Sequence, residues 1–594
     1  MDLIQFLLQW GIEMIISEFK YNNEIKDSWN NSAITKINIK GISGMPDGEY
    51  NFAKRNISVG EQSITCNNAV HEPIYNMGIY GNSVQDGTPT PETPIEVESV
   101  GEKTKNLFDY ISGFQSFSNG ITNTLNGDGT ITTVGIPSQN YIHIVKPKNI
   151  TDVLEDGETY TLSQTLYNVA IYAQIRETDV NTQTSRYIIS HRTPSTFKVD
   201  KSTYTYEINV QTTDSSSWGS ESLTITNGYQ LEKGDVATGF EPYGYKIPVK
   251  ATGKNLCSNE DIYFDVYNNY LIKDGTVTTT NSTLMGFIAK VEPNTEYTVS
   301  YNVLATDGVH NQRVREYSQL PTDWLKDFII QSINTPIKTT GITTQSFTTS
   351  ETTKYIIFGF YANIGGISIK DFQVEKGSNG TQYEPYIEPT TTNIYLKEPL
   401  RKIGDYADYI DYKNKKIIRK IKNLKLISSQ DWKKATYGTN SYSYYVDGMY
   451  KLIGTQALIY CTHFKGIPYG DRANEESNVI YVDYTDYGVY IRNTNYTTLE
   501  DLKTFFNNND VYIDYILITP IEETIELPSI ATSKGTNIFD IETSIKPSNV
   551  EIEYWKQIFE SDVQDNITQD NSNILIVSTG ANITQNGNVL AIGG

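Results

Sequence analysis

Side chains that could carry out catalysis are scattered along this chain and do not gather into a catalytic motif. The sequence has no His-Glu-x-x-His zinc spacing, no Gly-x-Ser-x-Gly nucleophile turn and no Gly-x4-Gly-Lys phosphate loop. It has 70 acidic residues, so carboxylate pairs will occur by chance at the roughly 5–10 Å separation that cleaves glycosidic bonds. The five histidines lie far apart, at His71, His143, His191, His310 and His463. The sequence therefore predicts a protein that is not an enzyme.

Aromatic side chains beside small or polar residues indicate binding chemistry of the kind that recognises sugars. An aromatic ring packs against the C–H face of a sugar, while a few polar groups orient its hydroxyls. Trp218 is flanked by serines and glycine, and Trp324 follows Pro-Thr-Asp. Tyr172, Arg176 and Tyr361 lie on or beside predicted strands. These five residues are the candidate ligand contacts, and the alternative for each is packing in the core or at a strand edge.

Cysteine spacing excludes a disulfide framework and a zinc site. Cys66, Cys257 and Cys461 are widely separated, so we expect buried or incidental thiols, consistent with synthesis in a reducing cytoplasm. No motif for an organic cofactor is present. Asp483 and Asp486 lie near a predicted turn and could ligate a structural calcium ion, with an ordinary solvated turn as the alternative.

The charge balance opposes binding to nucleic acid. With 48 basic and 70 acidic residues the net charge is −22, and such a chain repels a polyanion. Residues 1–13 are largely apolar but too short to span a bilayer, and they lack the basic start and cleavage site of a signal peptide. Met14 is an alternative start. We therefore expect no membrane insertion.

A stretch that occurs twice indicates how the chain is organised. The sequence QLEKG at 230–234, followed five residues later by FEPY, returns as QVEKG at 373–377 and YEPY, an offset of 143 residues. Upstream, the landmarks KNL and DGT return in the same order at offsets of 149 and 146. Solenoid repeats are only about 20–50 residues long, so this period indicates two whole domains in series. We interpret the repeated motif as architectural, since it reads as a last strand, a turn and an extended segment.

Composition and patterning predict a mainly β protein of several domains. The chain holds 44 tyrosines and many Thr, Asn and Ile residues, and β-branched and aromatic residues favour strands. Short strands separated by Asn-Gly, Asp-Gly and Ser-rich turns indicate two tandem jelly-roll-like β-sandwiches. The predicted strands are 160–166, 170–176, 204–211 and 223–226 in the first repeat, and 297–303, 355–360 and 367–374 in the second.

A different β-rich domain with one short helix follows the repeats. Thr498 can cap a helix near 498–507, with Asp501 three residues on, and Leu502, Phe505 and Phe506 share one face. The predicted domains are an N-terminal β-rich attachment module at 1–85, a Pro-rich linker at 86–102, sandwiches at 103–247 and 248–392, the C-terminal domain at 393–558, and a tail with a terminal hairpin at 559–594.

The repeated motif resembles the closing motif of carbohydrate-binding-module-like β-sandwiches in tail proteins of bacteriophages and prophages. GNSVQDGTPTP at 81–91 looks like their interdomain linker, and VYIDYILITPIEE at 511–523 is similar to a strand of their C-terminal domain. The resemblance covers residues 80–555. It implies a minor structural or receptor-binding protein of a phage tail or baseplate. Such proteins lie in the virion and often form homotrimers. They contact other tail or baseplate proteins and recognise host cell-wall polysaccharide. The motif transfers no catalytic or binding residue.

Three further functions stay open at this point. In a purely structural tail component, the sandwiches would serve only as spacers and surface decorations of the tail. A tail-borne polysaccharide depolymerase would need a carboxylate pair lining a cleft, and no such pair can be identified from the sequence. A secreted bacterial adhesin is disfavoured because an export signal and a wall anchor are missing. The abundance of Asn, Ile, Lys and Tyr suggests an AT-rich genome and a low-GC Gram-positive host.

Overall fold

The computed structural model describes the side chains of residues 77–551 with short gaps, and beyond this range it describes only the backbone of some strands. The gaps lie at 168–169, 190–193, 215, 217, 219, 259–269, 274–275, 280–284, 308–309, 324–325, 362–365, 436–442, 447–457, 472–477, 484–487 and 531–535. Trp324 and Asp486 lie outside the described residues, and for most of the expected attachment module only the backbone of several strands is described.

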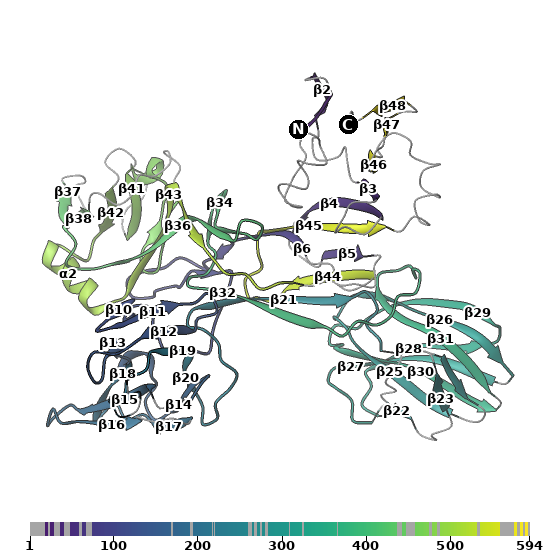
Figure 1. Cartoon of the computed structure of the whole chain (residues 1–594), viewed down its shortest axis with the longest axis horizontal. Helices are drawn as coiled ribbons and strands as arrows, with labels where there is room; N and C mark the ends of the chain where they lie inside the picture. Colours follow the sequence, from purple (N-terminus) through teal and green to yellow (C-terminus); the bar gives the residue numbers. More distant parts are fainter. Residues whose placement is uncertain are drawn as a thin grey trace.

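A β-sandwich at the centre of the molecule, here called the scaffold, carries three further units (Figure 1). One of its sheets has the strand order β39-β43-β36-β35-β6-β45-β4-β3-β46, and the other has the order β32-β21-β44-β5 with β9 beside β21. Ile79 of β6, Val249 of β21 and Phe539 of β44 are buried in one cluster, so the two sheets share a core. The strands are β3 Lys36–Lys40, β4 Gly48–Ser58, β5 Gln62–Cys66, β6 Ile74–Tyr80, β9 Glu102–Lys103, β21 Tyr245–Gly253, β32 Thr390–Leu396, β35 Tyr409–Asp411, β36 Lys416–Leu426, β39 Tyr460–Cys461, β43 Val511–Thr524, β44 Gly535–Ile541, β45 Asn549–Ile558 and β46 Leu575–Ser578.

Each of the three units is inserted between neighbouring strands of the scaffold. Repeat one lies between β9 and β21, repeat two between β21 and β32, and the third unit between β36 and β43. Strand β21 runs from one repeat to the other. Its nine residues span roughly 30 Å at about 3.3 Å per residue, which places the repeats at opposite ends of the scaffold (Figure 1).

The pairing of distant strands divides the chain differently from the sequence-based boundaries. The expected boundary between residues 247 and 248 falls inside β21. Strand β6 pairs with both β35 and β45, so segments assigned to separate N-terminal and C-terminal units share one sheet. The proline-rich segment also has fixed contacts, because Ile95 N donates to Thr462 O over 2.8 Å and Gln85 Nε2 donates to Cys461 O over 2.9 Å.

The two repeats are β-sandwiches of one topology, which confirms the predicted fold class. Their first sheets have the orders β13-β18-β15-β16 and β22-β25-β30-β27-β28. Their second sheets are β10-β11-β12-β19 with β17-β14-β20, and β23-β24-β31-β26-β29. The first-sheet strands are β13 His143–Asn149, β15 Ile171–Asp179, β16 Ser185–Ile189, β18 Tyr204–Thr212, β22 Phe264–Asp265, β25 Thr283–Lys290, β27 Val309–Tyr317, β28 Ile330–Ile337 and β30 Tyr355–Ile364. The second-sheet strands are β10 Phe117–Ser118, β11 Ile121–Leu125, β12 Ile131–Gly135, β14 Thr159–Gln164, β17 Ser195–Lys198, β19 Leu223–Asn227, β20 Tyr229–Lys233, β23 Tyr270–Lys273, β24 Thr276–Thr279, β26 Glu296–Thr306, β29 Gly341–Thr348 and β31 Ile367–Lys376.

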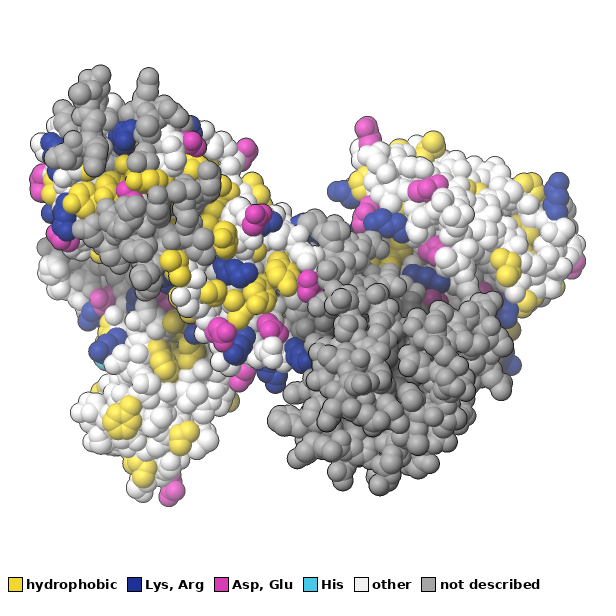
Figure 2. All heavy atoms as spheres, turned by 90° about the horizontal axis from the view of Figure 1, so that it is seen from above, with side chains coloured by type: hydrophobic (Ala, Val, Ile, Leu, Met, Phe, Trp, Pro, Cys, Tyr) yellow, Lys and Arg dark blue, Asp and Glu magenta, His cyan; other side chains and the backbone are white. Residues whose placement is uncertain are grey.

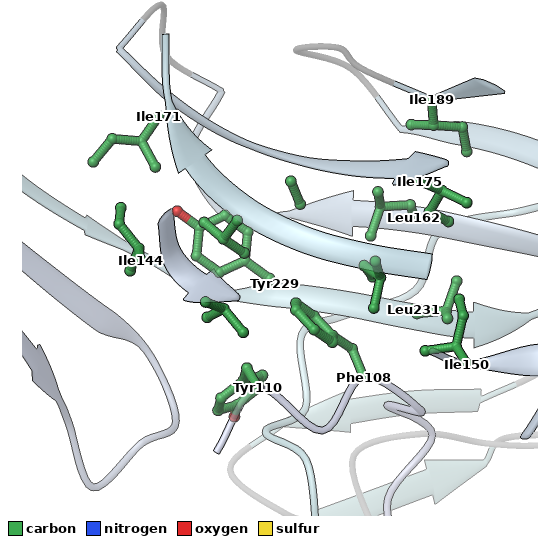
Figure 3. Packing of buried hydrophobic residues seen from close by; sticks show 14 of the residues in the cluster. Phe108, Tyr110, Ile144, Ile150, Leu162, Ile171, Ile175, Ile189, Tyr229 and Leu231 are labelled. Carbon is green, nitrogen blue, oxygen red and sulfur yellow. The ribbon is translucent and has the colours of Figure 1, made fainter. Parts of the chain in front are cut away.

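The core of repeat one fills the space between its two sheets (Figure 3). Ile171 and Ile175 come from the first sheet and meet Leu162 and Leu231 from the second, all at most 4% exposed. Alternate residues of a strand point to opposite faces. Because Ile171, Ala173 and Ile175 all belong to this core, the alternate residues Tyr172 and Gln174 lie on the outer face of the sheet.

One asparagine in each repeat ties the start of the domain to its last strand. Asn255 Nδ2 donates to Phe372 O and Glu384 O over 2.8 and 3.1 Å, and its Oδ1 accepts from Cys257 N and Val374 N over 3.0 and 3.1 Å. Asn106 makes the same four bonds in repeat one. The repeated landmark KNL is therefore a buried hydrogen-bonding clamp, which accounts for its recurrence.

The repeated closing motif is architectural as well. Gln373 Oε1 accepts from Glu384 N over 2.8 Å, and Gln373 Nε2 donates to Glu375 over 2.8 Å. Gln230, Glu232 and Glu241 repeat these bonds at 2.7 Å each. The motif thus folds the outgoing segment back onto the last strand. In repeat two it also reaches the scaffold, since the Glu384 carboxylate accepts from Thr536 N and Oγ1 over 2.6 and 2.9 Å.

The third unit packs the predicted helix against a sheet of order β37-β38-β42-β41-β40. These strands are β37 Lys433–Ala435, β38 Tyr442–Val446, β40 Lys465–Gly466, β41 Val479–Asp483 and β42 Gly488–Asn493. Helix α2, Leu499–Asn508, begins after a capping box between Thr498 and Asp501, and it buries Leu502, Phe505 and Phe506. The capping residues and the buried face are those predicted.

Replacing Thr498 with alanine is expected to cost about 1 kcal/mol of stability in the third unit, because an N-terminal backbone N–H loses its acceptor. The bond lost is the one from Asp501 N to Thr498 Oγ1, 3.2 Å long. Urea denaturation followed by circular dichroism measures the change. Thr494→Ala, at an exposed position just before the helix, is the matched control. Equal midpoints for the two variants would contradict the assigned role.

Candidate functional site

The outer face of the first sheet of repeat one gathers polar side chains with aromatic neighbours. On β15, Ile171, Ala173 and Ile175 belong to the core, while Tyr172 and Arg176 alternate with them and point away from it. Two of the predicted contact residues are thereby placed four residues apart on one face. The residue between them on this face is Gln174, which the sequence analysis did not single out.

Strand pairing extends this face across β18 into a set that we call the polar row. Its cross-strand pairs are Tyr172 with Gln211, Gln174 with Asn209, and Arg176 with Glu207. Within the row, Gln211 Nε2 donates to Tyr172 Oη over 2.9 Å, and Asn209 Nδ2 donates to Gln211 Oε1 over 3.1 Å. Arg176 and Glu207 form an ion pair. The row therefore combines three amide side chains, one tyrosine that is hydrogen-bonded to Gln211, and one ion pair.

The residues of the polar row differ in how far their side chains are buried. Gln174 is 2% exposed and Asn209 is 4% exposed, whereas Tyr172 and Arg176 are half-buried. Burial raises the pKa of Tyr172, so its hydroxyl stays protonated at neutral pH. Gln174 Nε2 has no hydrogen-bond partner among the described residues. A face that combines amides, a neutral phenol and aromatic surface suits an uncharged polyhydroxyl ligand.

Trp218 lies elsewhere and does not project from its loop. The ring packs against the core of repeat one, and its Nε1 donates to Thr213 O over 3.2 Å. This placement is the packing alternative described above. The small residues around Trp218 allow its indole to fold back onto the sandwich. Trp324, the second predicted tryptophan, lies outside the described residues.

Tyr361 lies on the corresponding face of repeat two. It is half-buried on β30, and the guanidinium carbon of Arg313 on β27 sits 4.6 Å from the centre of its ring. Sequence analysis missed Arg313, and also Gln174, Asn209 and Gln211. The available signal was alternation, since polar residues interleave with core residues along β15 and β18. Alternation marks the face of each strand, but it does not tell which strands are neighbours.

Among the described residues, no group of three or more His, Cys, Asp or Glu side chains could hold a metal ion. Asp483, one of the two calcium candidates, ends β41. Cys257 and Cys461 are buried free thiols, as predicted, and burial raises the pKa of Cys461 to about 12. No helix in the described part of the chain has the length and apolarity needed to cross a membrane.

A cavity of about 360 Å³ lies where repeat one meets the scaffold. Pro242 and Tyr243 of the closing motif line one side, and Glu523 and Glu526 of the scaffold line the other. Gly129 approaches Pro242 so closely that a Cβ there would lie 2.1 Å from the proline Cβ, and its φ of +80° also requires glycine. These contacts make the cavity part of the joint between the two units.

Lys and Arg side chains are interspersed with Asp and Glu over the described surface in Figure 2, where neither sign forms an extended area. Because the two signs are interspersed, the described surface in this view presents no extended field of one sign.

No family model matches the chain, and no curated protein matches it. Among solved structures, the tandem CBM22-1–CBM22-2 domain of Paenibacillus barcinonensis Xyn10C aligns over 50% of this chain and 98% of its own, with 9% identity and a TM-score of 0.19. A structure of infectious bursal disease virus, Gt strain, aligns over 89% of this chain and 86% of its own, with 10% identity and a TM-score of 0.12. Likeness at these scores carries no argument about function.

Proposed function

We propose that this chain binds polysaccharide on a host cell surface through the outer faces of its two sandwich repeats. The observation that carries the proposal is the polar row, in which Tyr172, Gln174 and Arg176 meet Gln211, Asn209 and Glu207 across β15 and β18. The outer face of an antiparallel sheet commonly carries polar side chains. Three amides beside a tyrosine are a set of donors and acceptors matched to sugar hydroxyls.

The setting of this binding function is a phage tail or baseplate in the virion. Support comes from the sequence resemblance at the closing motifs, at residues 81–91 and at 511–523. The same resemblance supports a homotrimer in contact with other tail proteins. Presenting the two repeats at opposite ends of β21 allows one chain to contact a polymer at two places, which raises avidity when the polymer spans both sites.

The test is binding of the fluorescently labelled full chain to low-GC Gram-positive cells and to their extracted wall polysaccharide. Tyr172→Ala is expected to weaken binding about tenfold or more, because an aromatic contact at a binding hot spot contributes at least about 1.4 kcal/mol. Phe117→Ala is the matched control, since this ring is 69% exposed on the second sheet of the same repeat. Saturable binding that both variants retain in full would place recognition outside the polar row.

A purely structural tail component is the second candidate. The observation that favours it is the packing of the partly buried Trp218 against the core of repeat one, which is the packing alternative for this residue. It predicts no saturable binding to any cell or polysaccharide. A depolymerase would instead release soluble reducing ends from the polysaccharide, which the same samples can report.

A further inference from the structure

Gln174 is the one member of the polar row whose side chain makes no hydrogen bond to any described residue. It is 2% exposed, and its Nε2 is buried without an acceptor. A buried N–H group without a partner is costly in the folded state, and native structures keep few of them. Gln174 lies on the outer face of its sheet, between Tyr172 and Arg176. A bound molecule can therefore supply the missing acceptor.

The hydrogen bonds within the polar row leave a second donor available beside Gln174. Gln211 Oε1 accepts from Asn209 Nδ2 over 3.1 Å, and Tyr172 Oη accepts from Gln211 Nε2 over 2.9 Å. A phenol oxygen that accepts a hydrogen bond still carries its own O–H, so Tyr172 can donate to a ligand. Tyr172 and Gln174 are alternate residues of β15, and their Cα atoms are roughly 7 Å apart. A ligand on this face therefore meets two donors in a row.

Two exposed tyrosines that the sequence analysis did not single out lie beside the polar row. Tyr187 on the edge strand β16 pairs with Arg176, which places it on the same face, and it is 55% exposed. Tyr141 lies just before β13, where its N–H donates to Thr213 O over 3.3 Å, and it is 51% exposed. Both are close enough to Tyr172 to add to the effect of burial in raising the pKa of that hydroxyl. Exposed aromatic rings of this kind offer surfaces for the C–H face of a sugar.

The backbone of Tyr141 adds an independent sign of a ligand contact. Its φ is +58°, in the left-handed region, and every other described non-glycine residue with positive φ has a polar or charged side chain. A bulky residue in this region is strained, and such strain is concentrated at ligand contacts and active sites. The fold therefore holds an exposed aromatic ring beside the polar row at a cost in stability.

The charges and the donors of the polar row favour an uncharged carbonyl group as the acceptor. The one cation of the row, Arg176, is paired with Glu207, and the carboxylate of Asp214 lies near Tyr172. These groups give an anionic ligand no net attraction. A hydroxyl that accepts from Gln174 brings a donor of its own, which needs a further acceptor. A carbonyl oxygen only accepts, so it satisfies the buried N–H and leaves no new group unpaired.

We propose that the outer face of repeat one binds a polysaccharide containing N-acetylated amino sugars, with Gln174 Nε2 donating to the acetamido carbonyl oxygen. The proposal rests on the proposed glycan-binding function and names its substrate class. The rings of Tyr141 and Tyr187 pack against the sugar units on either side, and the Tyr172 hydroxyl donates to a second oxygen of the polymer. The acetamido group is the uncharged carbonyl that amino sugars carry, and its methyl group adds apolar surface for an aromatic ring.

The experiment measures the affinity of the full chain for chitohexaose and cellohexaose by isothermal titration calorimetry. The two oligomers differ only in one substituent of each sugar, which is an acetamido group in chitohexaose and a hydroxyl in cellohexaose. Chitohexaose is expected to bind about tenfold tighter, the ratio that one good hydrogen bond to a buried donor provides. Polygalacturonate is measured beside them because its carboxylates are acceptors that carry charge. Extracted wall polysaccharide is the fourth ligand.

Gln174→Met removes the donor and nearly keeps the size of the side chain. It is expected to weaken binding of chitohexaose about tenfold and to leave binding of cellohexaose unchanged. Its unfolding temperature should equal or exceed that of the parent chain, because the amide that it removes has no partner in the fold. Gln183→Met is the matched control, since Gln183 is exposed in the loop between β15 and β16.

Tyr141→Gly tests the aromatic contact separately from the acetamido contact. Glycine adopts a φ of +58° freely, so the variant keeps the fold while it loses the ring. Binding of both oligomers should weaken about tenfold, because the ring packs against C–H groups that both sugars have.

The possible results separate this proposal from the proposed function. A preference for chitohexaose that Gln174→Met removes supports both. Saturable binding of wall polysaccharide without a preference for chitohexaose, or with a preference that Gln174→Met retains, overturns the acetamido assignment and leaves the proposed function standing. Tighter binding of polygalacturonate than of chitohexaose would assign the donors to a carboxylate and overturn it as well. Absence of saturable binding to every polysaccharide and oligosaccharide overturns both.

Discussion

Replacing Asn255 with alanine is expected to lower the free energy of unfolding of repeat two by about 4 kcal/mol, because four buried hydrogen bonds contribute about 1 kcal/mol each. Asn255 is 1% exposed, so water cannot replace the lost partners. The backbone N–H groups of Cys257 and Val374 would be left without an acceptor in the core. The loss would be concentrated in repeat two, since the clamp joins the two ends of that repeat.

Differential scanning calorimetry of the full chain would detect this loss of stability as an unfolding transition of repeat two at a lower temperature. Asn379→Ala is the matched control, because Asn379 is exposed in the turn after the last strand and bonds only to Ser378 among the described residues. Asn106→Ala should produce the same loss in repeat one. Unfolding transitions that coincide for Asn255→Ala and Asn379→Ala would show that the clamp does not hold the repeat together.

Replacing Asp408 with alanine is expected to destabilise the scaffold and the third unit by about 3–5 kcal/mol, the usual cost of removing one partner from a buried ion pair. Asp408 is fully buried and accepts hydrogen bonds from three backbone N–H groups, those of Arg401, Lys420 and Ile421, at 3.0, 2.7 and 3.0 Å. It also pairs with Arg419 at 3.5 Å. The variant would leave all of these donors without their acceptor.

Asp408 also stabilises an irregularity in the pairing of two scaffold strands. The register between β36 and β43 shifts between Arg419 and Ile421, and the N–H groups at this irregularity point to the Asp408 carboxylate. Urea denaturation measures the loss of stability, and Asp405→Ala, at an exposed position of the preceding turn, is the control. The stability of Asp408→Asn should lie between those of Asp408→Ala and Asp405→Ala, since an amide oxygen can accept some of these hydrogen bonds. Wild-type stability of Asp408→Ala would contradict the assignment.

Local patterns in the sequence were sufficient to predict several of the strands and the helix of the third unit. The alternation of apolar residues predicts strands such as 204–211 and 367–374, which are β18 and β31 in the structure. Thr498 and Asp501 predict the start of helix α2, because a capping box needs only residues three apart. The duplication and the architectural role of its closing motif could also be read directly, since matching residues at one offset form matching hydrogen bonds.

The tertiary structure alone decided which strands are neighbours, and with that the candidate site. Gln174 and Asn209 lie 35 residues apart, and only the pairing of β15 with β18 brings them together. In the same way β6 meets β45 across most of the chain, which turns segments expected in separate domains into one sheet. The physical reason is that strand pairing joins backbone groups that are common to every residue, so sequence marks the buried face of a strand but not its partner.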